Sequence, residues 1–115
     1  MLLAADGIST NTNIVEETYE TAVEQMVGIK TSTGVQVYDV STHIVERMNE
    51  RQIAASYIID ALCNPLKPWV IREDGSQQFI GEKATVVINV NTGEIVTVWA
   101  TKSKLTEKLR GEKIR

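Results

Sequence analysis

In the first half of the chain, apolar residues recur every three or four positions, which is the spacing of one buried face of an α-helix. The pattern predicts helices over residues 14–27, 43–52 and 53–62. Ser41 or Thr42 is a suitable N-cap for the second of these helices, because a hydroxyl oxygen can accept a hydrogen bond from a free backbone N–H of the first turn. The third helix is expected to end before "NPLKP", because the residue that precedes a proline disfavours helical backbone.

In the second half, apolar and polar residues alternate in short runs, which is typical of strands with one buried face. Tight turns at Asp74-Gly75 and at "NTG" predict that consecutive strands are antiparallel. A last short helix is expected over 103–110. We therefore expect an α+β fold, in which N-terminal helices pack on a twisted antiparallel sheet of three to four or more strands. The predicted strands cover residues 69–73, 77–81, 84–90 and 94–101, with a short additional strand over 34–40.

The last predicted strand carries polar and aromatic residues at alternate positions, and alternate positions lie on opposite faces of a strand. We expect the core face to hold Val96, Val98 and Ala100, and the opposite face to hold Ile95, Thr97, Trp99 and Thr101. The neighbouring strand divides in the same way, with a core face of Ala84, Val86, Ile88 and Val90. The mixed face is either the water-facing side of an open antiparallel sheet or a surface that binds a ligand.

The composition is that of an ordinary globular protein, with 43% hydrophobic and 23% charged residues among 115 positions. The charge is unevenly distributed. Residues 1–29 carry five acidic residues and no Lys or Arg, whereas the remainder holds all twelve basic residues against ten acidic ones. The net charge of −3 therefore hides a mildly basic body. Such asymmetry is a hint of a polyanionic partner, although a solvated charged tail is the commoner reason for it.

The length predicts a single domain, in which residues 1–27 form an acidic leader and helix and residues 28–115 form the functional body. No apolar run approaches the ~20 residues that span a bilayer, so no membrane anchor is expected. The single cysteine, Cys63, cannot form an internal disulfide, which favours a reducing compartment, and its apolar helix makes it a candidate core residue. With only one histidine the chain lacks the spacing of a zinc site, and we expect neither a metal nor a cofactor.

Basic residues recur along one side of the second predicted helix. His43, Arg47 and Arg51 are spaced four apart and therefore stack along one helical face. RNA can be cleaved without a metal if one group removes the 2′-hydroxyl proton and cations stabilise the charged transition state. Histidine suits the proton transfer because its unperturbed pKa of about 6.5 lies near the working pH, and arginine binds phosphate oxygens through two donors. The alternative is a solvated helix face, on which the arginines pair with Glu46 and Glu50.

The segments "STHIVERMNERQ", "DALCNPLKPW" and "QQFIGEKATVVINVNTGEIVTVWATKSK" occur in this order and carry a family resemblance. From about Gly28 to Lys108, roughly two-thirds of its length, the chain resembles the barnase, EndoU, colicin D and RelE ribonuclease superfamily. The similarity is to its phage-associated and polymorphic-toxin members, including toxin domains of contact-dependent growth inhibition proteins. The resemblance implies an α+β fold and a metal-independent endoribonuclease that leaves a 2′,3′-cyclic phosphate, most often on transfer RNA.

The resemblance also implies a set of site residues. His43 is expected to act as general base or acid, Arg47 and Arg72 to bind phosphate, and Thr97 and Thr101 to donate hydrogen bonds to the scissile phosphate. The expected catalytic residues are thus His43, Arg47, Thr97 and Thr101, and the expected substrate-binding residues are Arg51, Arg72, Gln78, Trp99 and Lys104.

The implied biological setting is competition between bacteria. Toxins of this kind are delivered into the cytoplasm of a target cell as the C-terminal part of a larger secreted protein. A cognate immunity protein blocks their cleft, and some use elongation factor Tu to present transfer RNA. The alternative that we keep open is a non-catalytic module of the same fold, phage-associated or protein-binding.

Overall fold

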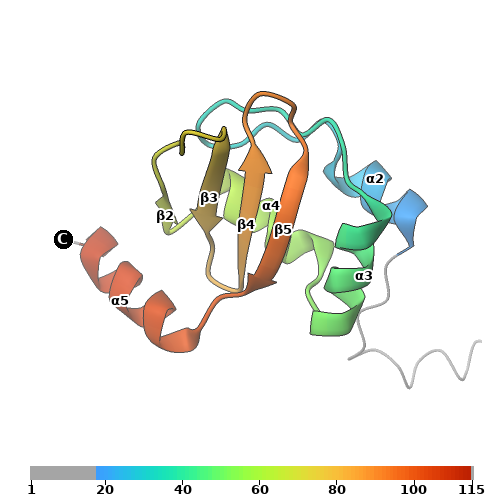
Figure 1. Ribbon diagram of the computed structural model, residues 1–115. Coiled ribbons are helices and arrows are strands. Elements are labelled where there is room, and N and C mark those ends of the chain that lie inside the picture. The colour runs from blue at the N-terminus through green and yellow to red at the C-terminus, as the bar shows by residue number, and fades with distance from the viewer. Residues whose placement is uncertain (1–17, 115) are drawn as a thin grey trace, which may run out of the picture.

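The computed structural model describes residues 18–114, so the predicted leader over 1–13 and the start of the first predicted helix lie outside the described residues. Within the described part, three helices are followed by four strands and a further helix (Figure 1). The strands form one antiparallel sheet in the order β2-β3-β4-β5, which confirms the predicted α+β class. In chain order the elements are α2 (Tyr19–Met26), α3 (Thr42–Arg51), α4 (Ala55–Cys63), β2 (Lys67–Pro68), β3 (Ser76–Ile80), β4 (Ala84–Asn89), β5 (Ile95–Ala100) and α5 (Ser103–Ile114).

Local capping sets where the helices begin. The hydroxyl of Ser41 accepts a hydrogen bond of 3.2 Å from the backbone N–H of Ile44, and α3 starts at the next residue, Thr42. The helix ends where Gln52 adopts left-handed backbone with φ of 55°. In α2, Thr18 and Thr21 form a reciprocal capping box. The bounds of α3 were predicted to within a residue. Helix α2 ends one residue before the predicted end at 27 but begins at Tyr19, whereas the predicted start at 14 lies outside the described residues.

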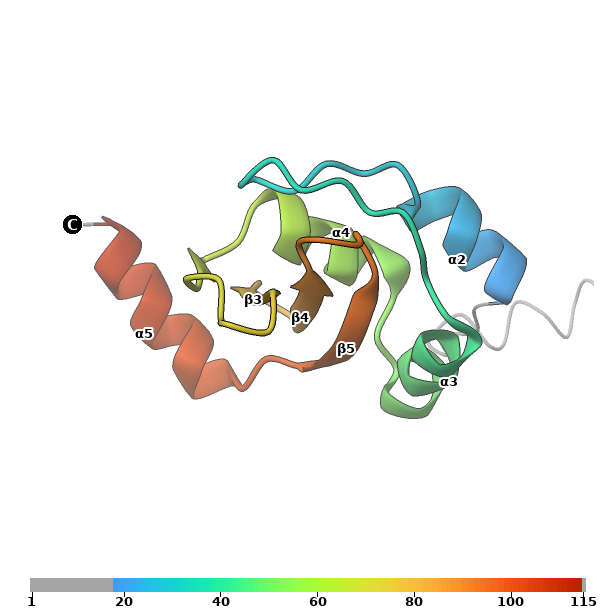
Figure 2. The same cartoon turned by 45° about the horizontal axis from the view of Figure 1, so that its top comes forward.

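The core lies between the helices and one face of the sheet. Figure 2 shows α4 across that face and α3 beside β5, while α5 stands at the other side of the molecule. Fully buried side chains of both layers meet there: Ile44, Met48, Ile58 and Leu62 from the helices, and Phe79, Val86, Ile88 and Val98 from the strands. Burial of such side chains is the main stabilising contribution. It explains why the apolar periodicity located these elements correctly.

A β-bulge overturns part of the predicted face assignment in β5. Val87 pairs with Thr97, but the next residue of β4, Ile88, pairs with Ile95, so that Val96 is an extra residue in the strand. Because of this extra residue, the part of β5 before Thr97 points its side chains to the opposite faces from those that strict alternation predicts. Ile95 is consequently buried, whereas Val96, which was predicted to face the core, is 48% exposed. Ala100 is exposed as well, at the end of the strand. Beyond the bulge the prediction is correct for Val98, which is buried.

Two predicted strands differ from those observed. Residues 34–40 form only isolated bridges, because their backbone bonds go to different segments: Val37 donates to Ile29, and Tyr38 donates to Gly93. The strand predicted over 69–73 is instead the two-residue β2, although the backbone N–H groups of Trp69 and Arg72 still donate to the β3 carbonyls of Gln78 and Ser76. Val70 is 80% exposed there. An edge segment with a partner on one side only is readily turned away from the sheet.

Candidate functional site

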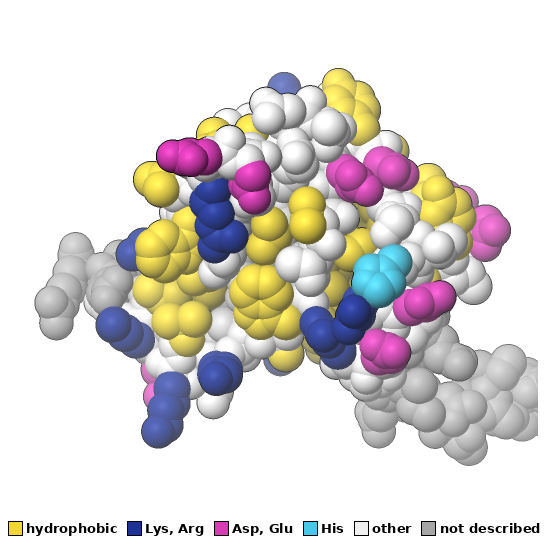
Figure 3. Space-filling view, in the orientation of Figure 1, with side chains coloured by type: hydrophobic (Ala, Val, Ile, Leu, Met, Phe, Trp, Pro, Cys, Tyr) yellow, Lys and Arg dark blue, Asp and Glu magenta, His cyan; other side chains and the backbone are white. Residues whose placement is uncertain are grey.

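The sheet face opposite α4 carries most of the predicted site residues. Two cross-strand rows lie on it: Gln78 pairs with Val87 and Val87 with Thr97, and Ile80 pairs with Thr85 and Thr85 with Trp99. We call the surface formed by these two rows the open face. Its inner residues Ile80, Thr85 and Val87 are buried, and solvent reaches the face at Gln78, Thr97 and Trp99. It faces the viewer in Figure 1, and Figure 3 shows hydrophobic side chains at its centre and Lys and Arg side chains mainly around its lower half. Acidic side chains lie along the upper rim and beside the histidine.

The threonine and tryptophan side chains of β5 occupy one border of this face. Trp99 is 36% exposed, which leaves part of its indole available for contact. Thr101, just past the strand, shares a hydrogen bond of 2.8 Å with the hydroxyl of Thr85, and its N–H donates to the carbonyl of Lys83. Its hydroxyl retains some capacity for a second partner, because a hydroxyl offers one donor and two acceptor positions. Thr97 lies between these residues and the bulge, half-buried.

Helix α3 presents its basic stripe beside β5, which is the edge strand of the sheet. Arg51 donates a hydrogen bond of 2.7 Å to the carbonyl of Val98 and thereby holds α3 to that edge. One helical turn earlier, Arg47 Nε donates to His43 Nε2 at 3.3 Å. The stripe therefore holds an imidazole and a guanidinium in contact with each other at the border of the open face.

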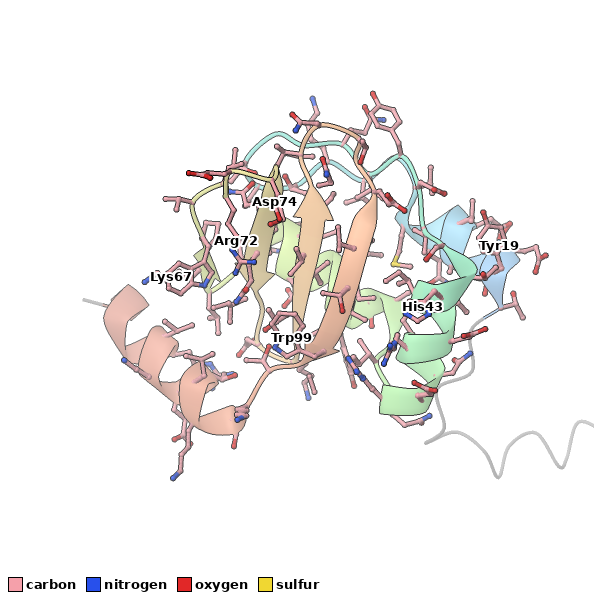
Figure 4. All side chains as sticks on the ribbon, in the orientation of Figure 1. Tyr19, His43, Lys67, Arg72, Asp74 and Trp99 are labelled. Atoms are coloured by element: carbon pink, nitrogen blue, oxygen red, sulfur yellow. The ribbon has the colours of Figure 1, made fainter. Side chains whose placement is uncertain are left out.

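On the opposite side, Arg72 folds over β3. Its Nη2 donates to Oε1 of Gln78 at 3.2 Å, which places a guanidinium on the row that ends at Thr97. Figure 4 shows Arg72 and Trp99 over the same face of the sheet, with His43 at its side on α3. The structure thus brings Arg72, Gln78, Thr97 and Trp99 onto one surface and His43, Arg47 and Arg51 to its border. Lys104 lies elsewhere, exposed in the first turn of α5.

A cavity of about 500 Å³ lies beyond the end of β5. Thr101 lines it, together with residues that the sequence had not indicated, such as Tyr57 and Lys83, whose Nζ lies 5.5 Å from the Tyr57 ring centroid. Arg110 and Glu82 form an ion pair in its wall. The other predicted site residues do not line it. Two cation–π contacts were missed. Lys83 and Tyr57 are far apart along the chain, and Lys67 lies two residues before Trp69 but outside the strand predicted over 69–73.

The surroundings of Asp74 and Cys63 shift the pKa values of these two side chains. The hydroxyl and the backbone N–H of Ser76 both bond Asp74, and they lower the pKa of its carboxyl. Burial, and then the charge of Asp60, raise the pKa of the Cys63 thiol. A raised pKa reduces the thiolate fraction. The expectation that Cys63 is a core residue is wrong, because its side chain is only half-buried at the end of α4.

Among residues 18–114 no three His, Cys, Asp or Glu side chains come together in a metal-binding group, and no helix is long and apolar enough to cross a membrane. Comparisons of the chain with protein-family models, with curated proteins and with solved structures gave no match.

Proposed function

We propose that the open face cleaves RNA, as a metal-independent endoribonuclease. The observation that carries the proposal is the contact of Arg47 Nε with His43 Nε2 on the helix that packs beside the strand bearing Thr97. This combination supplies a proton acceptor, a fixed positive charge and a hydroxyl donor on adjacent elements. These are the groups that favour metal-free cleavage of a phosphodiester by its neighbouring 2′-hydroxyl.

The chemistry follows from these groups. Arg47 turns from His43 to a phosphate oxygen, which frees the lone pair of Nε2. The imidazole then takes the proton of the 2′-hydroxyl, the 2′-oxygen attacks phosphorus, and the bond from phosphorus to the 5′-oxygen breaks. The departing 5′-oxygen takes the proton from the imidazolium, either directly or through a water molecule that passes it on. The products are a 2′,3′-cyclic phosphate and a 5′-hydroxyl, and the histidine returns to its neutral form.

The remaining residues bind and orient the substrate. Thr97 donates a hydrogen bond to the scissile phosphate. Thr101, at the end of the strand, donates a second one. Arg72 lies over Gln78 on β3, and Thr97 is on β5, two inter-strand spacings or roughly 10 Å away. Arg72 therefore binds a phosphate next to the scissile one rather than the scissile phosphate itself. Trp99 offers its exposed ring to a base.

The test is cleavage of a labelled oligoribonucleotide in the presence of a chelator. The unmodified protein should produce a 2′,3′-cyclic phosphate end, and a single 2′-deoxy nucleotide at the cut should prevent cleavage there. His43→Ala should slow the reaction by about 100-fold or more, which is the usual contribution of general acid–base catalysis. Thr97→Ala should also slow it. The matched control is Thr92→Ala, whose side chain lies in the β4–β5 turn and only accepts from the backbone N–H of Glu94.

Unchanged cleavage by both the His43 and the Thr97 variants would show that the site lies elsewhere. Cleavage that continues unimpaired across a 2′-deoxy nucleotide would exclude the proposed attack by the 2′-oxygen.

We further propose that the RNA is transfer RNA and that the protein acts as an antibacterial toxin with a cognate immunity protein. Induced expression in bacteria should arrest growth and yield discrete transfer-RNA fragments, and His43→Ala should relieve both effects. Dependence on elongation factor Tu can be tested by adding that factor to purified transfer RNA. Growth arrest with intact transfer RNA would contradict this part of the proposal.

A second candidate is a protein-binding module without catalysis. The hydrogen bond from Arg51 to the Val98 carbonyl favours this candidate, because it gives one cation of the predicted stripe a structural role. Exposed Val70 and Ile71 also suit a protein contact. The same expression experiment separates the candidates, since a binding module predicts healthy growth, intact RNA and a co-purifying protein.

A further inference from the structure

Both tryptophans of the chain lie on the open face. The sequence contains two, Trp69 and Trp99, and they are 44% and 36% exposed. In the pairing of β2 with β3, Pro68 lies opposite the buried Phe79, so the flanking Lys67 and Trp69 point to the other side. The backbone N–H of Trp69 donates to Gln78, which places the indole beside the row that ends at Thr97.

The two indoles stand at opposite borders of the sheet. Trp69 follows β2, and Trp99 belongs to β5, which is three inter-strand spacings away. Trp99 also lies in the next cross-strand row, so the backbones of the two tryptophans are roughly 15 Å apart. Arg72 lies between them on Gln78. Figure 4 shows this guanidinium over the sheet, on the side from which Trp99 is seen.

Positive charge accompanies each ring. Lys67 Nζ lies 4.9 Å from the Trp69 ring centroid, and the His43–Arg47 pair borders the strand that carries Trp99. Across the sheet, aromatic rings therefore alternate with cations, in the order Trp69, Arg72, Trp99 and Arg47. Stacking rings that alternate with cations are the common features of surfaces that bind single-stranded nucleic acid, because each base has a flat face and each linkage a negative charge.

We propose that Trp69 with Lys67 is a second base-stacking subsite, and that the ligand of the open face is single-stranded RNA laid from Trp69 to Trp99. Arg72 binds the phosphate between them. A duplex does not fit, because its bases are stacked on each other and their flat faces are unavailable to an indole. The inference rests on the proposed function in taking RNA as the ligand, and it assigns a strand state and a binding position to that RNA.

The experiment uses the two tryptophans as reporters. Trp69→Phe leaves only the indole of Trp99, and Trp99→Phe leaves only that of Trp69. Each variant is titrated with a single-stranded 2′-O-methyl oligoribonucleotide, which cannot be cleaved, and with the matching duplex. The single strand should quench the fluorescence of both variants, and the duplex should quench neither at the same concentration.

Affinity gives a second measurement. Trp69→Ala should weaken binding of the single strand by about 5- to 150-fold, the range found when a base–aromatic stack is removed. Val70→Ala is the matched control, since Val70 is apolar, adjacent and exposed but has no ring. It should bind like the unmodified protein. Thermal melting of each variant verifies that it folds.

Failure of the inference and failure of the proposed function are distinguishable. RNA cleavage that requires His43, combined with an unquenched Trp69 or an unchanged affinity in Trp69→Ala, would overturn the second subsite alone. Quenching and weakening as expected, without any cleavage, would leave the subsite in place and reject catalysis. Equal losses in Trp69→Ala and Val70→Ala, or equal binding of duplex and single strand, would overturn the inference in favour of a general apolar or charged surface.

Discussion

Arg51 should stabilise the fold more than it contributes to substrate binding. Its guanidinium donates to the Val98 carbonyl on the edge strand, 47 residues along the chain, and this bond joins α3 to β5. A hydrogen bond to a charged group contributes about 1.5–3 kcal/mol, and the exposure of Arg51 to water puts the expected value near the lower end. Arg51→Met keeps the length of the side chain but removes the donor. For a domain of this size the loss corresponds to a melting temperature lowered by about 5 °C.

Arg47→Met is the matched control, because Arg47 lies one turn earlier on the same helix and donates only to the His43 side chain. Melting followed by circular dichroism should show a decrease for Arg51→Met and almost none for Arg47→Met. RNA cleavage, measured well below either melting temperature, should fall more in Arg47→Met. Equal melting temperatures for the two variants would refute the structural role of Arg51, and the sequence-based assignment of Arg51 to substrate would then be preferred.

Two further predictions concern stability. Gly81→Ala should lower the midpoint of urea unfolding by an amount equivalent to about 1–3 kcal/mol, because the new Cβ would stand 2.7 Å from both Cα and Cβ of Ala61; Gly111→Ala, where nothing lies within 4 Å, should show no such loss. Asp74→Asn should destabilise the protein at neutral pH, since Ser76 lowers the carboxyl pKa in the fold; the difference from the unmodified protein should vanish as the pH falls through that lowered pKa. A difference that persists in acid would contradict the second prediction.

The helices and the core were accessible to sequence reasoning because both depend on local rules. Ser41 can cap only a helix that starts directly after it, and the apolar residues of α3 recur at the helical period. Burial then follows from the period, because Ile44, Val45 and Met48 recur at helical spacing and all three are buried. The pairing of β4 with β5 is similarly local, because the predicted tight turn at "NTG" between these consecutive strands makes them antiparallel.

The end of β2 could not be predicted, because it depends on neighbours that the chain acquires only when folded. The segment after Pro68 has the apolar alternation of a strand, yet β3 is its only strand partner and the turn at Arg72 follows closely. The sequence pattern for this reason predicts Trp69 as an ordinary residue of a strand over 69–73. Its contact with Lys67 depends on the two side chains sharing a face in β2, which the predicted strand over 69–73 had excluded.

The bulge in β5 decides which part of that strand can belong to the candidate site. Strict alternation over 95–101 would have placed Ile95 on the open face beside Thr97, but the extra residue Val96 turns Ile95 into the core. The orientation of Thr97 and Trp99 is fixed instead by Val98, which is buried between them. Bulges often change the direction of side chains near functional sites. In this chain the bulge limits the open face on β5 to the C-terminal half of the strand, the half that Arg51 connects to the basic stripe of α3.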